Sequence, residues 1–341
     1  MKILVTGGTG YIGSHTVVEL QTAGYEVLIV DNLANSNIEV LNAIEKITGK
    51  KPVFELTDLK NTDDTYNLIR KHKDIQGVIH FAALKAVGES VEKPLEYYHN
   101  NLFSLINLLG AMMENQIHNF VFSSSCTVYG QPDVLPVDEN APLKKAESPY
   151  GNTKKISENI IEDTVSATPL QAIALRYFNP IGAHETALIG ELPIGIPNNL
   201  VPYITQTAIG KREYLRVFGD DYSTPDGTPI RDYIHVVDLA KAHVVAIDRL
   251  LKKKNKKAFE IFNLGTGNGF SVMEVINSFE RVSGMKLNYK IVERRPGDIE
   301  KVWSDTAFAN QELDWKAEKG LDEMMSSAWK WELELKKSGI V

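Results

Sequence analysis

The chain has 341 residues with an ordinary apolar fraction of 43 %, enough for about two globular domains with a sizeable core. It has no run of about 18 apolar residues, so we expect no membrane span. The formal net charge of -7 argues against a nucleic-acid partner. Its single cysteine, Cys126, excludes an intrachain disulfide and a multi-cysteine zinc site and predicts a reducing, cytoplasmic location.

The N-terminus predicts a nucleotide-binding turn. An apolar run at residues 3–5 predicts a buried parallel strand, and three spaced glycines follow it before a helical stretch. Gly7 permits a tight reversal, Gly10 lets the main chain approach a ligand, and Gly13 lets the helix pack against the strand, so bare amides face one point. Asp31 follows the second predicted strand, where a carboxylate accepts the ribose hydroxyls of NAD and repels the extra phosphate of NADP. The alternative is an ordinary glycine-rich turn.

Strand and helix patterns alternate through the first half of the chain. Strands are predicted at 3–5, 27–30, 53–56, 78–80, 120–123 and 173–175, and helices near 12–23, 38–47, 63–71, 95–114 and 150–165. This alternation predicts an α/β fold with a Rossmann-like, doubly wound parallel sheet.

The composition changes after Arg176, where residues 177–233 are rich in Pro, Gly and Asn. We therefore expect an NAD-binding domain at 1–176 and a smaller α/β substrate-binding domain at 177–341. A strand pattern at 259–264 indicates that the chain returns to the first domain near 234–267.

The helix predicted at 95–114 is apolar on more than one side, which implies a second buried contact beyond the sheet. With the helix at 150–165 and their symmetry mates, it would form a four-helix homodimer interface. The alternative is coverage by the C-terminal region of the same chain.

Three side chains carry candidate chemistry. Ser125 follows the strand at 120–123, and Tyr150 and Lys154 share one face of a helix at positions i and i+4. A neighbouring ammonium and a positive nicotinamide ring would lower the pKa of the Tyr150 phenol toward neutrality, so that it could take a proton from an alcohol. The serine would hydrogen-bond the substrate hydroxyl. The alternatives are a helix-capping serine cluster and a capping-region tyrosine at a domain boundary.

Motifs along the whole chain match one family. They lie at residues 6–15, 31–33, 80–90, 93–98, 176–183, 196–200, 217–219, 231–236, 263–267 and 294–298. Through them the chain resembles the UDP-glucose 4-epimerases of the extended short-chain dehydrogenase/reductase superfamily. Several of these motifs lie in the predicted substrate domain, so the resemblance bears on the substrate as well as the fold.

The resemblance implies NAD as cofactor and a set of ligand contacts. Besides the three glycines, the cofactor contacts would be Tyr11, Ile12, Asp31, Asn32, Asn35, Ser36, Asp58, Leu59, Phe81, Ala82, Lys85, Asn100, Tyr150, Lys154 and Tyr177. The contacts to UDP and sugar would be Ser125, Tyr150, Asn179, Asn199, Leu200, Arg231, Arg295 and Asp298. Guanidinium forks suit a pyrophosphate, although either arginine alone could be an ordinary ion-pair residue. No metal is implied.

By the same resemblance, the expected reaction is reversible epimerisation at carbon 4 of UDP-glucose and UDP-galactose through a transient 4-keto sugar, as in galactose metabolism. Val302 falls where the family has a size gate, and a valine there leads to the hypothesis that UDP-N-acetylhexosamines are also accepted.

Three other functions share parts of this sequence pattern. A nucleotide-sugar 4,6-dehydratase needs an Asp-Glu pair where this chain has Cys126 and Thr127. UDP-glucuronate epimerisation or decarboxylation is harder to exclude. A non-catalytic NAD sensor would not need the serine, tyrosine and lysine, and all three are present.

Overall fold

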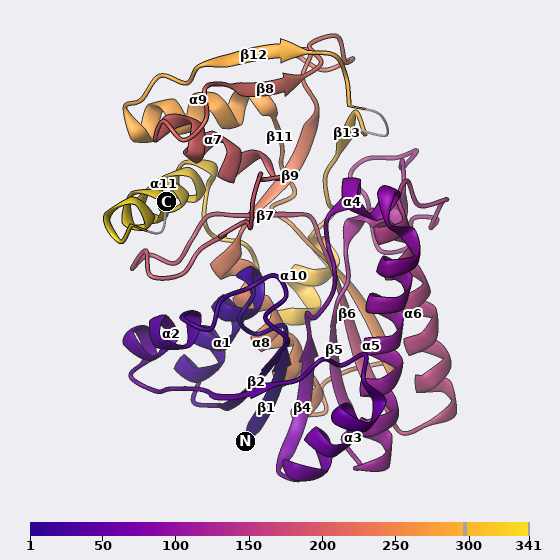
Figure 1. Cartoon of the computed structure of the whole chain (residues 1–341). Helices are drawn as coiled ribbons and strands as arrows, with labels where there is room; N and C mark the ends of the chain where they lie inside the picture. The colour runs from indigo at the N-terminus through magenta and orange to yellow at the C-terminus, as the bar shows by residue number, and fades with distance from the viewer. Residues whose placement is uncertain (296–298, 340–341) are drawn as a thin grey trace.

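The computed structural model describes residues 1–295 and 299–339. A seven-stranded parallel sheet forms its base, in the order β10-β6-β5-β4-β1-β2-β3 (Figure 1). These strands are β1 (Lys2–Thr6), β2 (Glu26–Asp31), β3 (Val53–Leu56), β4 (Ile75–His80), β5 (Asn119–Ser123), β6 (Gln171–Tyr177) and β10 (Phe259–Leu264). The strand order reverses between β1 and β4, and ligands of such sheets bind in the crevice outside that point.

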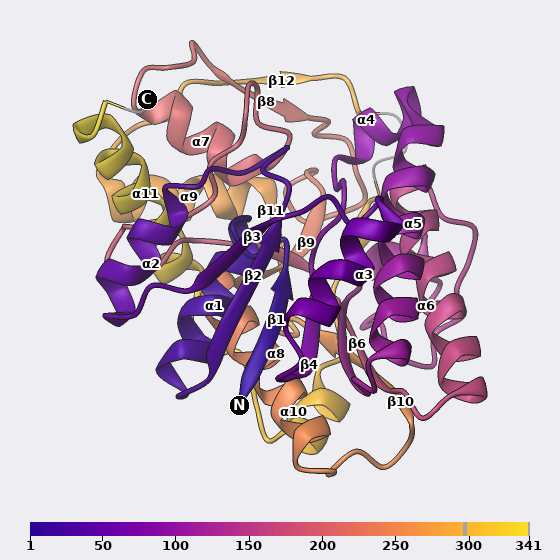
Figure 2. The same ribbon diagram turned by 60° about the horizontal axis from the view of Figure 1, so that its bottom comes forward.

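Successive residues of each strand face opposite sides of the sheet, so both faces are apolar and both are covered. Ile3 and Val5 point to one core and Leu4 to the other. The first face carries α1 (Tyr11–Thr22), α2 (Val40–Thr48), α8 (Val236–Leu251) and α10 (Ala307–Leu313). The second carries α3 (Thr62–Lys71), α5 (Pro94–Glu114) and α6 (Pro149–Ala167), which Figure 2 shows from another side. We call this sheet with its helices the sheet lobe.

A smaller set of elements lies over the carboxyl end of the sheet, and we call it the cap lobe (Figure 1). Its four-stranded sheet contains β7 (Asn179–Ile181), β9 (Ile230–His235), β11 (Gly269–Ser271) and β13 (Lys301–Val302). A separate parallel pair joins β8 (Leu215–Phe218) to β12 (Tyr289–Val292). Helices α7 (Leu200–Ala208), α9 (Val272–Ser283) and α11 (Leu321–Lys337) share a third hydrophobic core with these strands.

The predicted fold class is confirmed, and every strand predicted in the first half is present. The strand predicted at 259–264 is β10, which pairs in parallel with β6 and so returns the chain to the main sheet. The helix predicted from residue 38 begins only at Val40, and the helix predicted from 95 begins at Pro94. Proline suits a first helical turn because its missing N–H would have no partner there.

Helix α5 is apolar on more than one side, as predicted. Its inner face packs in the second core, while Leu95, Phe103 and Ile106 are exposed. The alternative that the chain's own C-terminal region covers this outer face is wrong, because α11 packs in the cap lobe against α7 and α9. Across residues 1–295 and 299–339, no helix combines the length and the apolar character that crossing a membrane requires.

Candidate active site

The glycine turn joins β1 to α1 under tight steric constraint. Gly7 has φ +68°, and a Cβ on it would lie 2.8 Å from the backbone nitrogen of Ala82. Gly10 caps α1 in extended conformation. A Cβ on Gly13 would lie 2.2 Å from the carbonyl oxygen of Gly7, so this glycine lets the helix pack on the turn itself. Side chains are thus excluded from a cradle in front of the helix N-terminus, which suits a pyrophosphate.

The acid after β2 is tied to this turn. One oxygen of Asp31 accepts from the amide of Thr9 at 3.3 Å, and the other accepts from the amide of Leu33 at 2.9 Å and the hydroxyl of Ser36 at 3.2 Å. These contacts hold a carboxylate at the sheet edge beside the glycine turn. The site therefore has both parts that a dinucleotide requires, an anion cradle and a ribose acceptor.

Local structure places the three candidate catalytic side chains. Ser125 lies after β5 and caps the short 3-10 helix η1 (Cys126–Tyr129), its Oγ accepting from the amide of Thr127 at 3.2 Å. Ser148 caps α6 and accepts from the amide of Gly151, which puts Tyr150 in the first turn and Lys154 one turn later. All three candidate side chains are buried.

Lys154 is held in place by the end of β5, near the Tyr150 ring. Lys154 Nζ donates to the carbonyl oxygen of Ser123 at 2.7 Å and lies 5.9 Å from the Tyr150 ring centroid. The hydroxyl of Ser123 is in turn 2.7 Å from the hydroxyl of Tyr177. The lysine is thereby fixed between the end of β5 and the tyrosine, within one buried cluster.

The protein alone does not lower the pKa of Tyr150; the predicted lowering also depends on a positive nicotinamide ring beside the phenol. Burial, and secondarily the nearby Tyr177, raises the pKa of Tyr150, and the hydrogen bond with Ser125 opposes this. Burial also lowers the pKa of Lys154 to about 8, with Glu158 acting in the opposite sense. Desolvation therefore dominates the pKa of the phenol, and a positive charge placed next to the ring would be needed to reverse the direction of the shift.

A buried network behind the lysine was not predicted from the sequence. Glu158 receives two hydrogen bonds from Arg176, at 3.0 Å and 2.6 Å, and one from Ser124 at 2.5 Å. Arg176 also donates to the hydroxyl of Tyr129 at 3.0 Å, and Tyr129 donates to Asn263 of β10 at 2.7 Å. The available signal was spacing, because Glu158 lies four residues after Lys154 on the same helical face.

The remaining predicted cofactor residues gather at one edge of the sheet. Tyr11 and Ile12 open α1; Asn32, Asn35 and Ser36 follow β2; Asp58 and Leu59 follow β3; Phe81, Ala82 and Lys85 follow β4; Asn100 lies in α5, and Tyr177 ends β6. Asn32 Nδ2 donates to Asp58 Oδ2 at 3.4 Å, while the Asn35 side chain is exposed in its loop.

The predicted substrate residues other than Ser125 and Tyr150 lie in the cap lobe. Asn179 begins β7, Asn199 and Leu200 begin α7, Arg231 is in β9, and Val302 is in β13 opposite Arg231. The Arg295 guanidinium lies 4.8 Å from the Phe218 ring centroid. Val302 is buried with Tyr129 and Phe178. Asp298 lies outside the described residues.

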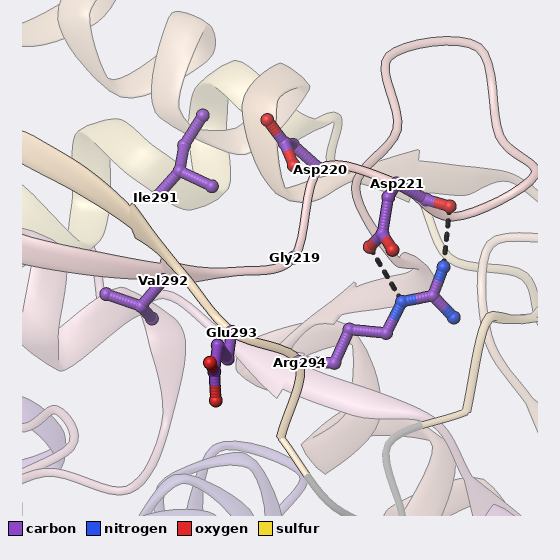
Figure 3. A pocket seen from close by; sticks show the side chains of 7 residues that line it. All are labelled: Gly219, Asp220, Asp221, Ile291, Val292, Glu293 and Arg294. Atoms are coloured by element: carbon purple, nitrogen blue, oxygen red, sulfur yellow. Dashed lines mark hydrogen bonds and ion pairs between the residues drawn. The ribbon is translucent and has the colours of Figure 1, made fainter.

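A groove beside β8 and β12 is a poor candidate for the phosphate site. Figure 3 shows its lining, in which the Arg294 side chain reaches toward Asp221. Arg294 Nε donates to that carboxylate at 2.7 Å, and Asp220 and Glu293 add two further acids. The cation is already paired and the other charges are negative, so this groove would repel a diphosphate.

Comparisons with known proteins agree with one another. The sequence model of a family described as GDP-mannose 4,6 dehydratase matches residues 4–328. The chain is 51 % identical over 333 residues to a UDP-glucose 4-epimerase of Pasteurella multocida (strain Pm70), covering 97 % of both chains. It superposes with a TM-score of 0.95 and 47 % identity, over 99 % of both chains, on a UDP-glucose 4-epimerase of Stenotrophomonas maltophila solved with NAD and formylated UDP-arabinopyranose. The chain also superposes on a UDP-glucose 4-epimerase of Bifidobacterium longum, solved with NAD+ and UDP. The TM-score is 0.94 and the sequence identity is 46 %, over 98 % of both chains.

A parallel sheet that carries the glycine turn, the acid after β2 and the buried Tyr150–Lys154 pair along one edge defines an extended short-chain dehydrogenase/reductase. The matched family model and the cap lobe narrow this class to enzymes of nucleotide sugars. Within it, the chain belongs to the UDP-glucose 4-epimerase family.

Proposed function

We infer that this protein interconverts UDP-glucose and UDP-galactose by inverting carbon 4 of the hexose, using tightly bound NAD. The observation that carries the inference is the buried cluster of Ser125, Tyr150 and Lys154 beside the glycine turn, in a chain about half identical to epimerases over nearly its full length. NAD, when bound, supplies a reversible hydride acceptor. The fit rests on the cradle in front of α1 and on the Asp31 carboxylate.

The residues take the following roles. Tyr150 exchanges a proton with the hydroxyl on carbon 4, in one direction as base and in the other as acid. Lys154, held by the carbonyl of Ser123, keeps a positive charge near the phenol. Ser125 hydrogen-bonds the same hydroxyl. Arg231 and Arg295 hold the diphosphate, so that the nucleotide supplies most of the binding while the sugar is free to turn over between the two proton transfers.

A dehydratase function is less well supported, although the matching family model has that description. The acid/base pair it requires would stand at Cys126 and Thr127, and burial raises the pKa of the Cys126 thiol to about 12. A neutral thiol and a hydroxyl cannot relay protons as two carboxyl groups can.

The first test is to incubate the purified protein with UDP-galactose, without added NAD, and to measure UDP-glucose. We expect turnover with resident cofactor. A Tyr150→Phe variant should retain NAD and lose roughly 1,000-fold or more in kcat, the upper part of the range for general acid–base catalysis. If the unchanged protein shows no turnover even with NAD supplied, the epimerase assignment is wrong, and UDP-glucuronate should be tried next.

Val302 offers a way to test substrate range. Its small side chain lies beside Tyr129 and Phe178 and opposite Arg231, and we propose that it leaves room for an N-acetyl group. We expect Val302→Tyr to lower kcat/KM for UDP-N-acetylglucosamine about tenfold or more, with UDP-galactose affected less. Equal losses on both sugars would contradict the role, and Val302→Ile is the control for packing.

We propose that residues 1–176, with a return segment near 234–267, form the NAD-binding domain. Residues 177–341 would form the UDP-sugar-binding domain. The pairing of β10 with β6 supports the return. A cytoplasmic location is also proposed, on the ground that the only cysteine is a free thiol.

A homodimer through α5 and α6 is proposed as well. Leu95, Phe103 and Ile106 form an exposed apolar stripe on α5, at 81 %, 51 % and 50 % relative exposure. A stripe of this kind on a helix packed beside α6 is typical of a subunit interface. We expect light scattering to give twice the chain mass for the unchanged protein and a smaller mass for Phe103→Glu. A monomer at micromolar concentration would contradict the proposal.

A further inference from the structure

The loop between β7 and α7 carries a glutamate that the roles above leave unused. Glu191 follows a short hairpin closed by a bridge between Ala183 and Gly190. Its carbonyl oxygen accepts from the indole N–H of Trp331 in α11 at 3.0 Å. Gly190 packs on the same indole, where a Cβ would lie 2.5 Å from the ring. The backbone at Glu191 is therefore held by α11 through Trp331.

The side chain of Glu191 joins two parts of the molecule. Its Oε1 atom accepts from Lys85 Nζ at 3.3 Å and from Asn199 Nδ2 at 2.6 Å. Lys85 belongs to the loop after β4, in the sheet lobe, whereas Asn199 caps α7 in the cap lobe. The glutamate side chain is only 12 % exposed, against 48 % for the lysine. This pair is thus better shielded from solvent than an ordinary surface ion pair.

A second contact crosses between the lobes at the same place. Tyr11, from the first turn of α1, donates its hydroxyl to the carbonyl of Gly182 at 2.6 Å. Lys85 Nζ lies 5.9 Å from the Tyr11 ring centroid. Tyr11 and Lys85 are proposed cofactor contacts, and Asn199 is a proposed nucleotide contact. Glu191 lies where these two groups meet.

We propose that Glu191 is a positioning residue that orients Lys85 toward the cofactor and Asn199 toward the uridine diphosphate, and so couples the two ligand sites. A carboxylate can only accept hydrogen bonds, so the NH2 end of the Asn199 amide must face it and the carbonyl end is directed elsewhere. An ammonium has three donors, so Lys85 keeps two for a ligand. The inference rests on the proposed epimerase function for the identity of both ligands.

The test compares Glu191→Gln with Glu185→Gln, an exposed glutamate of the same hairpin. A glutamine at 191 lacks the charge and can present a donor, so the Asn199 amide loses its fixed orientation. We expect about a tenfold rise in KM for UDP-galactose and in the Kd for UDP measured by calorimetry, with kcat falling less than threefold. The Glu185→Gln protein should match the unchanged protein in all three.

Two further proteins separate positioning from simple loss of structure. The double variant Lys85→Met with Glu191→Gln should lose little more UDP affinity than Glu191→Gln alone, because Lys85 acts on the UDP site only through Glu191. Trp331→Phe keeps the glutamate and removes the indole donor, and should weaken UDP binding about threefold at unchanged kcat. Losses that simply add, or a Glu191→Gln protein that binds UDP like Glu185→Gln, would overturn the proposal. The UDP titration needs no turnover, so it decides this question even if the epimerase assay fails.

Discussion

Two buried glutamates, one in each lobe, differ in how completely their carboxylates are hydrogen-bonded. Glu158, under the catalytic cluster, is 3 % exposed and receives three hydrogen bonds, two of them from Arg176. Glu332, in α11 of the cap lobe, is 4 % exposed; one oxygen accepts from Thr205 at 2.8 Å, and the other has no hydrogen-bond partner among the residues that the structure describes. Burial raises the pKa of Glu332.

The difference in hydrogen bonding between Glu158 and Glu332 indicates which of the two buried carboxylates supports the candidate active site. The Glu158–Arg176 pair anchors Ser124, next to the candidate catalytic serine, and its carboxylate supports the positive charge of Lys154. Within residues 1–295 and 299–339, no comparable cluster of partners surrounds Glu332. We infer that the first carboxylate is retained for the geometry and charge of the site, and that the second is a local cost to stability.

The largest expected effect comes from breaking the paired site. Glu158→Gln leaves the Arg176 guanidinium buried without its counter-charge, and we expect a loss of about 3–5 kcal/mol in unfolding free energy. Urea unfolding of this variant should be compared with Glu162→Gln, an exposed glutamate one turn further along α6. A loss below about 1 kcal/mol would mean that the pair does not behave as a buried ion pair.

Removing both charges of the pair should separate its effect on stability from its effect on activity. The double variant Glu158→Leu with Arg176→Met removes both charges of this buried pair, so most of the stability should return, to within about 1–2 kcal/mol of the unchanged protein. Activity should not return with it. Glu158 raises the pKa of Lys154 against the effect of burial, so without it the ammonium is lost at lower pH.

The readout is the pH profile of kcat. Its alkaline limb should move to lower pH in the double variant, whereas a purely structural role for the pair would lower kcat equally at every pH. An unmoved alkaline limb would therefore assign Glu158 to packing alone.

Much of this site was predictable because it follows rules local in the sequence. The glycine turn, Asp31 and the Tyr150–Lys154 pair lie on elements whose order and spacing are visible in the chain. The Glu158–Arg176 pair and the contacts of Glu191 could not be predicted in the same way. Arg176 lies on β6 and Glu158 on α6, so their contact depends on how the helix packs on the sheet. Glu191 meets Lys85 across more than 100 residues, so that contact depends on how the two lobes pack.

The same limit applies to the electrostatics. A sequence shows that a lysine lies one turn from a tyrosine, but it does not show how completely both are desolvated. Here burial dominates the pKa of each and raises that of Tyr150, so the predicted lowering depends on the charge of the cofactor. The direction of a pKa shift therefore required the packed structure, even though the residue types were known.

The smallest predicted effect is a gain in stability in the cap lobe. Glu332→Met removes a buried carboxylate, and Thr205 keeps an acceptor in the carbonyl of Pro202 at 3.2 Å. The folded-state pKa of Glu332 is raised, so the folded state holds its proton more tightly than the unfolded chain does. The resulting penalty is absent below the unfolded pKa of about 4.3, grows as the pH rises through the folded pKa, and is constant above it.

The methionine variant should accordingly be more stable than the unchanged protein by about 1 kcal/mol at pH 8, and the difference should shrink toward pH 4. Thermal unfolding at both pH values measures it, with Glu334→Met as control because that side chain on α11 is 42 % exposed in a surface ion pair. If the methionine variant is less stable than the unchanged protein at pH 8, the Glu332 carboxylate stabilises the fold. The two glutamates would then differ in their hydrogen-bond geometry and not in the sign of their effect on stability.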